Sequence, residues 1–497
     1  MKSDRIEKIL IVGDGISAWI SAAILANGLA EHDVEINVLA SVTRTKPINP
    51  LAESTLPPSN RFHKILGINE KDLMAKCNGT FKLGVRYCHW RNQNQEGLQL
   101  FGGFQSGAPV ALHHIANKLR RSGHEINYTD FSLAGIAARE NRFVHPSSDT
   151  QSIYSSIAYG MHLDGLRYLE YLREYSESKG VRCFKGEIEN IECSVSTGFL
   201  QQIKLRDGHK LKADFFIDAS GNEAKLIGDV CQIGLESWAH YLPCNTGFRL
   251  QSKVDKCKLL TLIKGEPFGW SKAVPLKEYT EHIVVGVDSI MPDSKLMDLV
   301  NNKVNAGGSA IDILNFKSGV RKKLWQHNCL AVGAAAVSLD PLVISESFLT
   351  QSAVFRWLDY FPTKKCSPFL QQEYNRITVE ESKRARDFHC AHYLLRDDVE
   401  SKFAQVCRNL IMSVDLKWKL DLFISRGRIA FFEEEIIRGD TWADFFLALD
   451  LWPKRYDPYT DKFSENQLME WHDSVTTTVQ AAVNSMPVHE DYLQNYI

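Results

Sequence analysis

Short apolar runs alternate with a longer apolar stretch near the N-terminus. Residues 7–13 (EKILIVG) form an apolar run that ends at a glycine, and residues 34–40 (VEINVLA) form a second one. Between them, residues 16–30 (ISAWISAAILANGLA) are small and apolar at helical spacing. This pattern predicts a strand–helix–strand unit, followed at 41–60 by a long loop rich in Thr, Pro, Asn and Ser.

The same periodicities predict further elements. Residues 161–180 have the amphipathic spacing of a helix that ends at Gly180, a residue type favoured just after a helix. Residues 346–361 predict a long apolar helix, and from about 370 onward the chain is mostly helical and dense in Trp and Phe. Strands are predicted in a region between about 230 and 300 and in the runs 181–192, 198–205, 211–218 and 329–337.

The turn after the first strand reads Gly13-Asp14-Gly15-Ile16-Ser17-Ala18. In a GxGxxA loop the first glycine makes the tight turn, the second lets the backbone approach a pyrophosphate, and the small third residue lets helix and strand pack closely. The loop therefore predicts a dinucleotide site, although a plain strand–helix turn has similar residues. A carboxylate for the ribose is missing, because the second strand ends at Ala40, and Ser41 offers one weaker hydrogen bond.

The predicted core strands are far apart in the sequence. A Rossmann-type sheet interrupted by large insertions explains this spacing better than successive independent domains. We therefore expect a mixed α/β fold with a Rossmann-type core, an inserted sheet and a helical C-terminal part. The expected boundaries are 1–370 for the core domain, about 85–160 and 230–300 for the inserted sheet, and 371–497 for the helical subdomain.

Composition and charge indicate which kinds of partner and which cellular compartment to expect. The 497 residues are 44% hydrophobic and 24% charged, as in ordinary globular proteins. With 58 Lys and Arg against 60 Asp and Glu, there is no positive excess for a phosphate backbone, so we expect no nucleic-acid partner. The sequence has no signal-peptide pattern and no run of about 18 apolar residues, which predicts no membrane contact. The eleven scattered cysteines, without CxxC or zinc spacing, favour free thiols in a reducing cytoplasm and no metal site.

Eight short segments carry further motifs. They are 50–58 (PLAESTLPP), 80–90 (TFKLGVRYCHW), 159–164 (YGMHLD), 214–221 (DFFIDASG), 241–245 (YLPCN), 329–342 (CLAVGAAAVSLDPL), 425–428 (SRGR) and 455–458 (RYDP). In this order, and over nearly the whole chain, they resemble segments of the flavin-dependent tryptophan halogenases.

The resemblance implies a flavoprotein of the flavin monooxygenase type. Its FAD would be used as FADH₂ supplied by a separate flavin reductase, and its substrate would be a small electron-rich aromatic such as tryptophan or an indole. In that family, reduced FAD, O₂ and halide yield hypohalous acid, which reaches a lysine beside the substrate. The helical C-terminal part covers the substrate side. The resemblance also allows a possible homodimer.

The family motifs imply roles for particular residues. Lys82 corresponds to the catalytic lysine. The residues implied at the cofactor are Gly13, Gly15, Ile16, Ser17, Ala18, Ser41, Glu53, Ser54, Thr55, Asp218, Gly221, Gly333, Pro341 and Leu342. Those implied on the halide or substrate side are Trp270, Ser345 and Glu346.

Lys82 has two interpretations. It lies in the apolar run TFKLGV, where strand alternation would place it on the same face as Thr80 and Gly84. A solvent-facing lysine on a half-exposed strand fits this pattern. The family resemblance favours a buried lysine, whose lowered pKa would make it an amine nucleophile or a directed hydrogen-bond donor.

Three departures from the family pattern put halogenation in question. The GWxWxIP signature here has Lys272 at its second Trp. In the segment that resembles PLESTG, Val343 replaces the catalytic glutamate, and Ser345 and Glu346 replace the Thr-Gly pair at the halide site, where an ionised carboxylate would repel chloride. The third departure is Ala40, where the family has a glutamate.

Two classes of function stay open after these departures. One is an active flavin enzyme, either a halogenase or a neighbouring flavin monooxygenase that hydroxylates because halide cannot enter. The other is a non-catalytic family member that keeps the fold. Flavin binding by the purified chain would separate the two classes.

Overall fold

The glycine-ended run predicted at 7–13 forms β1 (Lys8–Val12), an inner strand of a six-stranded sheet. The sheet has the order β20-β21-β12-β1-β2-β8, and β1 pairs in parallel with β2 and β12. The other strands are β2 (Glu35–Ser41), β8 (Arg182–Gly186), β12 (Phe215–Asp218), β20 (Trp325–Gln326) and β21 (Cys329–Ala331).

These strands come from a computed structural model. It describes residues 4–41, 50–92, 94–102, 110–253, 258–292, 294–295, 297–299, 301, 309–397 and 401–497. The mixed α/β fold with a parallel Rossmann-like sheet is confirmed.

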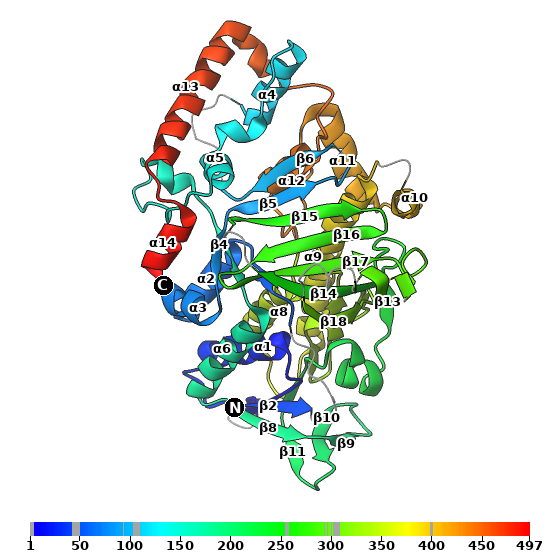
Figure 1. The fold of residues 1–497 in the computed structure, drawn as a ribbon. Coiled ribbons are helices and arrows are strands. Elements are labelled where there is room, and N and C mark those ends of the chain that lie inside the picture. Colours follow the sequence, from blue (N-terminus) through cyan, green and yellow to red (C-terminus); the bar gives the residue numbers. More distant parts are fainter. Residues whose placement is uncertain are drawn as a thin grey trace.

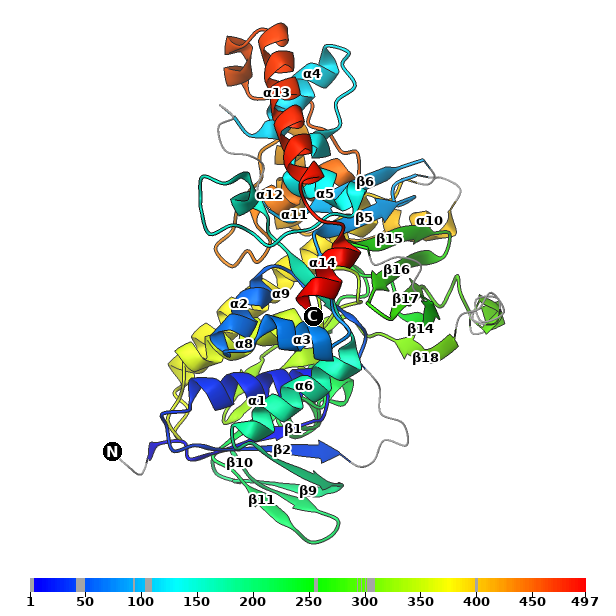
Figure 2. The ribbon, with the colours of Figure 1, turned by 60° about the vertical axis from the view of Figure 1, so that its left-hand side comes forward.

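The first helix is enclosed on several sides. α1 (Ile16–Gly28) follows the glycine loop, and all residues from Ile16 to Ala26 are buried. It packs against the sheet and against α6 (Gly165–Ser178) and α8 (Glu346–Asp359), which lie beside it in Figures 1 and 2. This enclosure explains why its sequence is apolar nearly all round instead of along one stripe.

A seven-stranded sheet lies above the first one in Figure 1. Its order is β18-β14-β17-β16-β15-β5-β6, so it combines strands from two separate parts of the sequence. The strands are β5 (Gly84–Cys88), β6 (Glu96–Leu100), β14 (Thr246–Lys253), β15 (Leu260–Glu266), β16 (Gly269–Pro275), β17 (Tyr279–Gly286) and β18 (Ser309–Asn315).

A separate three-stranded sheet corrects the helix predicted over 161–180. Its strands are β3 (Glu53–Ser54), β7 (Gly160–Leu163) and β4 (Thr80–Lys82), in the order β3-β7-β4. The start of the predicted helix is therefore a strand, because it pairs with two segments about a hundred residues upstream. The helix α6 begins only after Asp164, whose carboxylate accepts hydrogen bonds from two backbone N–H groups of its first turn.

Three other predicted strands are divided. The run 181–192 forms β8 and β9 (Ile188–Cys193), and the run 211–218 forms β11 (Lys210–Lys212) and β12. In the run 329–337, β21 ends at Ala331, a 3-10 turn follows at Gly333–Ala335, and a new strand begins at Val337. Between β11 and β12, the carboxylate of Asp214 accepts hydrogen bonds from the backbone N–H groups of Glu7 and Lys8. The remaining strands are β10 (Leu200–Leu205), β13 (Leu235–Ser237), β19 (Gly319–Arg321) and β22 (Val337–Ser338).

Helices that lie far apart in the sequence form the upper part of the molecule in Figure 1. α13 packs there against α4 and α5, although more than three hundred residues separate them in the chain. The remaining helices are α2 (Pro58–Ile65), α3 (Glu70–Lys76), α4 (Leu112–Arg121), α5 (Leu133–Glu140), α9 (Pro368–Leu394), α10 (Lys402–Arg408), α11 (Val414–Arg426), α12 (Gly439–Ala448), α13 (Glu465–Asn484) and α14 (His489–Tyr496).

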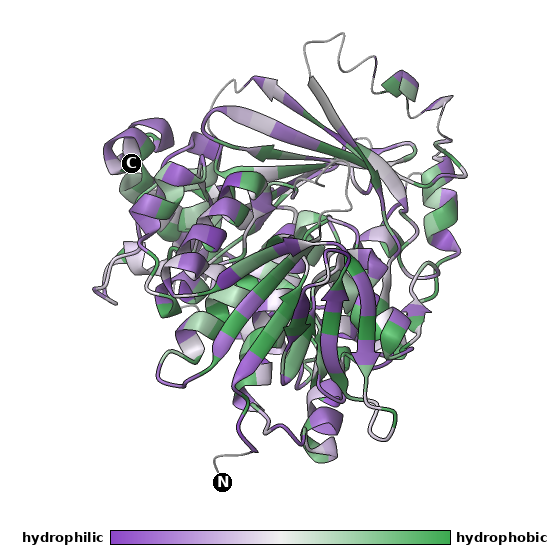
Figure 3. Ribbon diagram, turned by 90° about the horizontal axis from the view of Figure 1, so that it is seen from below, coloured by the Kyte–Doolittle hydropathy of each residue, from purple (hydrophilic) through white to green (hydrophobic). Residues whose placement is uncertain are grey.

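Hydrophobic and hydrophilic residues interleave along the ribbons (Figure 3). Within the described part of the chain, no helix combines the length and the apolar character that a membrane crossing requires.

Candidate active site

The loop between β1 and α1 has the geometry of a phosphate cradle. Gly13 has a φ of +139°, and a Cβ placed on it would lie 2.2 Å from the carbonyl oxygen of Ala219. Only glycine fits that close approach. Gly15 is exposed, and a Cβ placed on it would meet nothing within 4 Å. The open space therefore lies at the N-terminus of α1, where a phosphate would meet backbone N–H groups and the positive end of the helix dipole.

Ser17 and Glu346 meet at this loop. Ser17 Oγ donates to Glu346 Oε1 at 2.6 Å and accepts from Thr350 Oγ1 at 3.0 Å. Gly333, with a φ of +59°, packs so closely that an added Cβ would lie 2.4 Å from both Ser17 Oγ and Glu346 Oε1. The carboxylate of Glu346 is thus directed at the first turn of α1. The sequence alone does not predict the contact between Ser17 and Glu346.

Asp218 is placed differently from the expectation that it contacts the cofactor. It is fully buried at the end of β12, and both its oxygens accept hydrogen bonds from the chain. The donors are the backbone N–H and hydroxyl of Ser220 and the backbone N–H groups of Leu226 and Ile227, at 2.6–3.1 Å. Asp218 therefore fixes the turn in which Gly221 has a φ of +67° and presents no free oxygen to a ligand.

The end of β2, where dinucleotide sites commonly have a carboxylate for the ribose, has none. Ala40 is half-buried and pairs with Lys185 of β8. Ser41 ends the strand, but its side chain lies outside the described residues.

Lys82 is buried, which excludes the solvent-facing interpretation. Its side chain is 1% exposed, and Nζ donates to the carbonyl oxygens of Ser54 at 3.3 Å and Thr55 at 3.2 Å. Nζ also lies 4.9 Å from the ring centre of Phe101. Burial holds the pKa of Lys82 well below its usual value, and the positive charge of Lys272 adds to this effect, while Glu53 opposes it.

The segment Glu53-Ser54-Thr55, expected at the cofactor, lies beside Lys82. Ser54 Oγ is hydrogen-bonded to Thr261 Oγ1 at 2.6 Å, and Thr55 Oγ1 accepts from the backbone N–H of Met161 at 2.7 Å. Glu53 Oε1 accepts from Ser347 Oγ, whereas its Oε2 is buried without a hydrogen-bond partner among the described residues. Burial raises the pKa of Glu53.

Lys272 is a second buried lysine of the site. It is 7% exposed and donates from Nζ to the carbonyl oxygen of Pro341 at 2.6 Å. Burial lowers its pKa to about 8, and the carboxylates of Glu53, Glu281 and Asp340 oppose the shift. The sequence marked Lys272 as a departure from the family, but not its proximity to these groups.

Trp270, expected on the substrate side, is fully buried in β16. Its Nε1 donates to Tyr393 Oη at 3.0 Å, and Tyr393 Oη donates to Asp340 Oδ2 at 2.5 Å. His389 Nε2 accepts from the backbone N–H of Ile344 at 3.0 Å, so its Nδ1 carries a proton toward Asp340 Oδ1 at 3.0 Å. These contacts, which sequence reasoning missed, position the segment 340–344.

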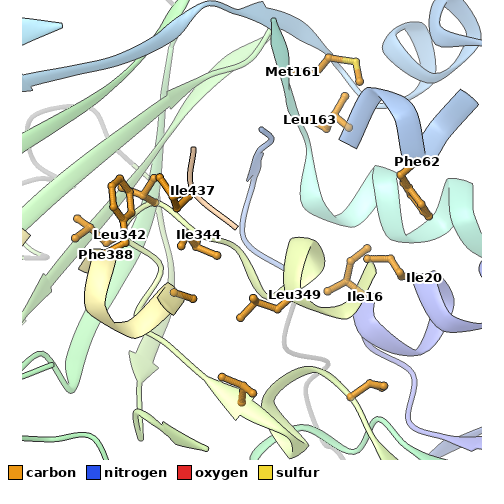
Figure 4. Close-up of a cluster of buried hydrophobic side chains, with 14 of the residues drawn as sticks. Ile16, Ile20, Phe62, Met161, Leu163, Leu342, Ile344, Leu349, Phe388 and Ile437 are labelled. Atoms are coloured by element: carbon orange, nitrogen blue, oxygen red, sulfur yellow. The ribbon is translucent and has the colours of Figure 1, made fainter. Parts of the chain in front are cut away.

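The segment 340–344 has an apolar residue, Val343, at the position where the family has its glutamate. Val343 is 9% exposed, and its neighbours Leu342 and Ile344 lie in the hydrophobic cluster of Figure 4 with Phe388 and Ile437. Ser345 caps α8 by accepting from the backbone N–H of Phe348. No carboxylate therefore stands at position 343.

An open groove of about 1600 Å³ lies elsewhere, along the edge formed by β5, β6 and β15. Its lining includes Arg86, Glu96, Arg139, Leu260 and Trp452, but neither Lys82 nor Lys272. The groove is thus separate from the buried lysines.

Comparison with known proteins gives a consistent result. The tryptophan halogenase family model matches residues 8–465. A tryptophan 6-halogenase of Streptomyces albogriseolus is 24% identical over 452 residues, covering 84% of this chain and 82% of the relative. The structure of a flavin-dependent halogenase from Brevundimonas sp. BAL3 superposes with a TM-score of 0.93 at 26% identity, covering 99% of both chains. That of a flavin-dependent halogenase from Xanthomonas campestris gives 0.92 at 26% identity, covering 99% and 98%.

The family match spans residues 8–465, which is most of the chain. This chain belongs to the tryptophan halogenase family.

Proposed function

We propose that the chain is an FAD-dependent oxidoreductase of the halogenase type, in which Lys82 directs a halogen electrophile to an electron-rich aromatic substrate such as tryptophan or an indole. The observation that carries the proposal is the environment of Lys82. The side chain of Lys82 is 1% exposed and its amine donates to two backbone carbonyls, so it is not a surface lysine that keeps the protein solvated. Its lowered pKa suits an amine that reacts as a nucleophile.

The residues of the glycine loop fit the pyrophosphate of FAD. The space over Gly15 is open, and Gly13 allows the close turn that leads into α1. Gly13, Gly15, Ile16 and Ala18 would hold the pyrophosphate, with Gly333 and the segment 341–342 on the flavin side. When bound and reduced, FAD supplies hypohalous acid from O₂ and halide. Because the sequence contains no second nucleotide loop, a separate flavin reductase would deliver the reduced cofactor.

The neutral amine of Lys82 then accepts the halogen. Its nitrogen attacks the halogen atom of hypohalous acid, an N–X bond forms, the O–X bond breaks, and the amine proton leaves with the oxygen as water. Burial among the carbonyls of Ser54 and Thr55 orients the amine and excludes bulk water. Glu53, which interacts electrostatically with Lys82, is available to hold a proton.

The test uses the full chain with FAD, a flavin reductase, NADH, O₂, bromide and indole. We expect brominated indole from the wild-type protein and none from Lys82→Met, with the flavin absorbance of both proteins retained after desalting. Lys185→Met, which removes an exposed lysine of β8, is the matched control and should brominate like the wild type. A wild-type protein that binds flavin but never brominates would refute the halogenase assignment.

One observation favours a second candidate, flavin-dependent hydroxylation without halide. Glu346 directs its carboxylate at Ser17 and Gly333, where the family has the Thr-Gly pair of its halide site. Two like charges about 4 Å apart at an effective dielectric of about 20 repel by about 4 kcal/mol, and the exposure of Glu346 to solvent reduces this value. Oxygenated indole that forms at the same rate with and without bromide would support this candidate.

A further inference from the structure

His162 lies in the middle of the three-stranded sheet that carries Lys82. It is fully buried in β7, and it pairs with Ser54 on β3 and with Thr80 on β4. Paired residues have their side chains on the same face of a sheet, and Lys82, two positions after Thr80, shares that face. The imidazole therefore stands between the strand that carries Lys82 and the strand whose Ser54 carbonyl accepts from its amine.

Both nitrogens of the His162 ring are hydrogen-bonded to buried hydroxyls. Nδ1 lies 3.0 Å from Thr80 Oγ1, and Nε2 lies 2.9 Å from Thr261 Oγ1. Thr80 uses its only hydroxyl proton to donate to the carbonyl oxygen of Pro275 at 2.7 Å, so it accepts from the Nδ1–H of His162. Burial lowers the pKa of His162 well below its usual value and keeps the ring neutral. Nε2 therefore carries no proton and accepts from Thr261.

The hydrogen bonds continue from Thr261 to Ser54. Because Thr261 donates to the ring, its Oγ1 accepts from Ser54 Oγ at 2.6 Å. The carbonyl oxygen of the same Ser54 accepts from Lys82 Nζ at 3.3 Å. The donor order is thus fixed from Ser54 through Thr261 and His162 to Thr80. Beyond Thr80 the chain ends at a backbone carbonyl, which has no proton to pass on, so these hydrogen bonds hold groups in place and do not conduct protons.

The residue of β7 that pairs with Lys82 is a glycine, Gly160. A Cβ placed on Gly160 would lie 2.4 Å from the carbonyl oxygen of Thr55, which is the second acceptor of the Lys82 amine, at 3.2 Å from Nζ. A side chain at this position would therefore displace that carbonyl. β7 thus contributes a glycine that leaves room for the acceptor and, two positions later, a histidine that is hydrogen-bonded to both neighbouring strands or their partners.

We propose that His162 is a positioning residue for the Lys82 amine: as the Nδ1–H tautomer, it holds the strand that carries Lys82 and the carbonyl of Ser54 at a fixed separation. This inference rests on the proposed function, in which Lys82 directs the halogen. The position of the amine decides whether the halogen reaches the aromatic ring or leaves the protein as hypohalous acid. Loss of the hydrogen bonds should therefore lower the share of halogen that is delivered within the protein.

Two substitutions at Thr261 separate hydrogen bonding from packing. Thr261→Val keeps the shape of the side chain but removes the hydroxyl that joins Ser54 to His162, whereas Thr261→Ser keeps the hydroxyl and loses a methyl group. If the hydrogen bonds position Lys82, valine should be harmful and serine should behave nearly like threonine. If Thr261 only fills space, the order of the two variants should be reversed.

The full chain is assayed with FAD, a flavin reductase, NADH, O₂, bromide and indole, with and without excess free methionine, which removes hypobromite that has left the protein. The fraction of brominated indole that survives methionine does not depend on how much protein is folded. We expect it to fall at least threefold in Thr261→Val and in His162→Leu, but not in Thr261→Ser. Thr478→Val, which removes an exposed hydroxyl on α13, is the matched control. A wild-type fraction in both Thr261→Val and His162→Leu would overturn the inference while the proposed function stands.

A measurement on flavin-free protein does not depend on halogenation. Acetylation with a low dose of acetic anhydride at pH 8, read by peptide mass spectrometry, reports how firmly the Lys82 amine is held, with exposed Lys185 as the internal reference. We expect Lys82 to label at least threefold faster in Thr261→Val than in the wild type, and at the wild-type rate in Thr261→Ser. Equal labelling of Lys82 in the wild type and Thr261→Val would overturn the inference. The expected labelling pattern in a protein that binds flavin but never brominates would instead refute the proposed function alone.

Discussion

Replacing Lys272 by Met should change the pH dependence of stability. The pKa of this lysine is about 8 in the folded protein, against an ordinary value of 10.5. Between these values the unfolded chain binds more protons than the folded one, so the free energy of unfolding of the wild type rises with pH. Below pH 8 both states are protonated, and burying the ammonium costs about 3 kcal/mol. Above 10.5 this cost is absent.

Methionine has a similar length and no charge, so Lys272→Met removes the whole cost. It also leaves the carbonyl of Pro341 without its hydrogen bond, which destabilises by about 1–3 kcal/mol at every pH. The net change at pH 7 is thus anywhere from neutral to a stabilisation of about 2 kcal/mol. The stability difference between variant and wild type should nevertheless become about 3 kcal/mol less favourable between pH 7 and pH 10.5.

The assay is urea unfolding of flavin-free wild type and variant at pH 7, 8, 9 and 10.5, followed by circular dichroism. Lys185→Met serves as the control, because an exposed lysine on β8 should show no comparable change with pH. If the Lys272→Met difference were constant from pH 7 to pH 10.5, the charge balance that we assign to the buried amines would be wrong.

Three further predictions follow from the loop and the segment behind it. Gly15→Ala should fold like the wild type but bind FAD at least tenfold more weakly in a fluorescence titration, because its methyl enters the open space assigned to the pyrophosphate, and equal affinity would contradict the cradle. Gly13→Ala should also lower the melting temperature, because its methyl meets a backbone carbonyl at 2.2 Å. Glu346→Gln should tighten FAD and lower the apparent KM for bromide severalfold in low-salt buffer, with a smaller effect at high salt, and an unchanged KM would place the halide elsewhere. Asp340→Asn should cost about 1–3 kcal/mol in urea unfolding, because one of two buried donors loses its acceptor; wild-type stability would show that these hydrogen bonds are dispensable.

Local features of the fold could be predicted from the sequence. The run KILIVG and the following small apolar residues gave β1 and α1, because alternation, helical spacing and glycine all act over a few residues. The helix predicted at 346–361 is α8, whereas of the strand predicted at 329–337 only Cys329–Ala331 forms β21. The ordered motifs pointed to the family, which the match over residues 8–465 establishes.

The features that could not be predicted from the sequence depend on partners far along the chain. Residues 160–163 form β7 because they pair with β3 and β4, and no local periodicity reports that pairing. The contact of Glu346 with Ser17 spans 329 positions, and that of Lys272 with Pro341 spans 69. A sequence can mark such a residue as unusual, but its partner is set by the packing of separate elements.

The discontinuous six-stranded sheet has a consequence for synthesis of the protein on the ribosome. β1 is complete at residue 12, but its neighbour β12 begins only at residue 215 and the next strand, β21, at residue 329. At roughly 5–20 residues per second, β1 waits on the order of 10–40 seconds for β12. During that time β1 has only β2 beside it in the sheet, and α1 still lacks α8, which begins at residue 346, so the nascent chain exposes an incomplete apolar sheet. Chaperone binding during translation should therefore matter more for this protein than its final stability suggests.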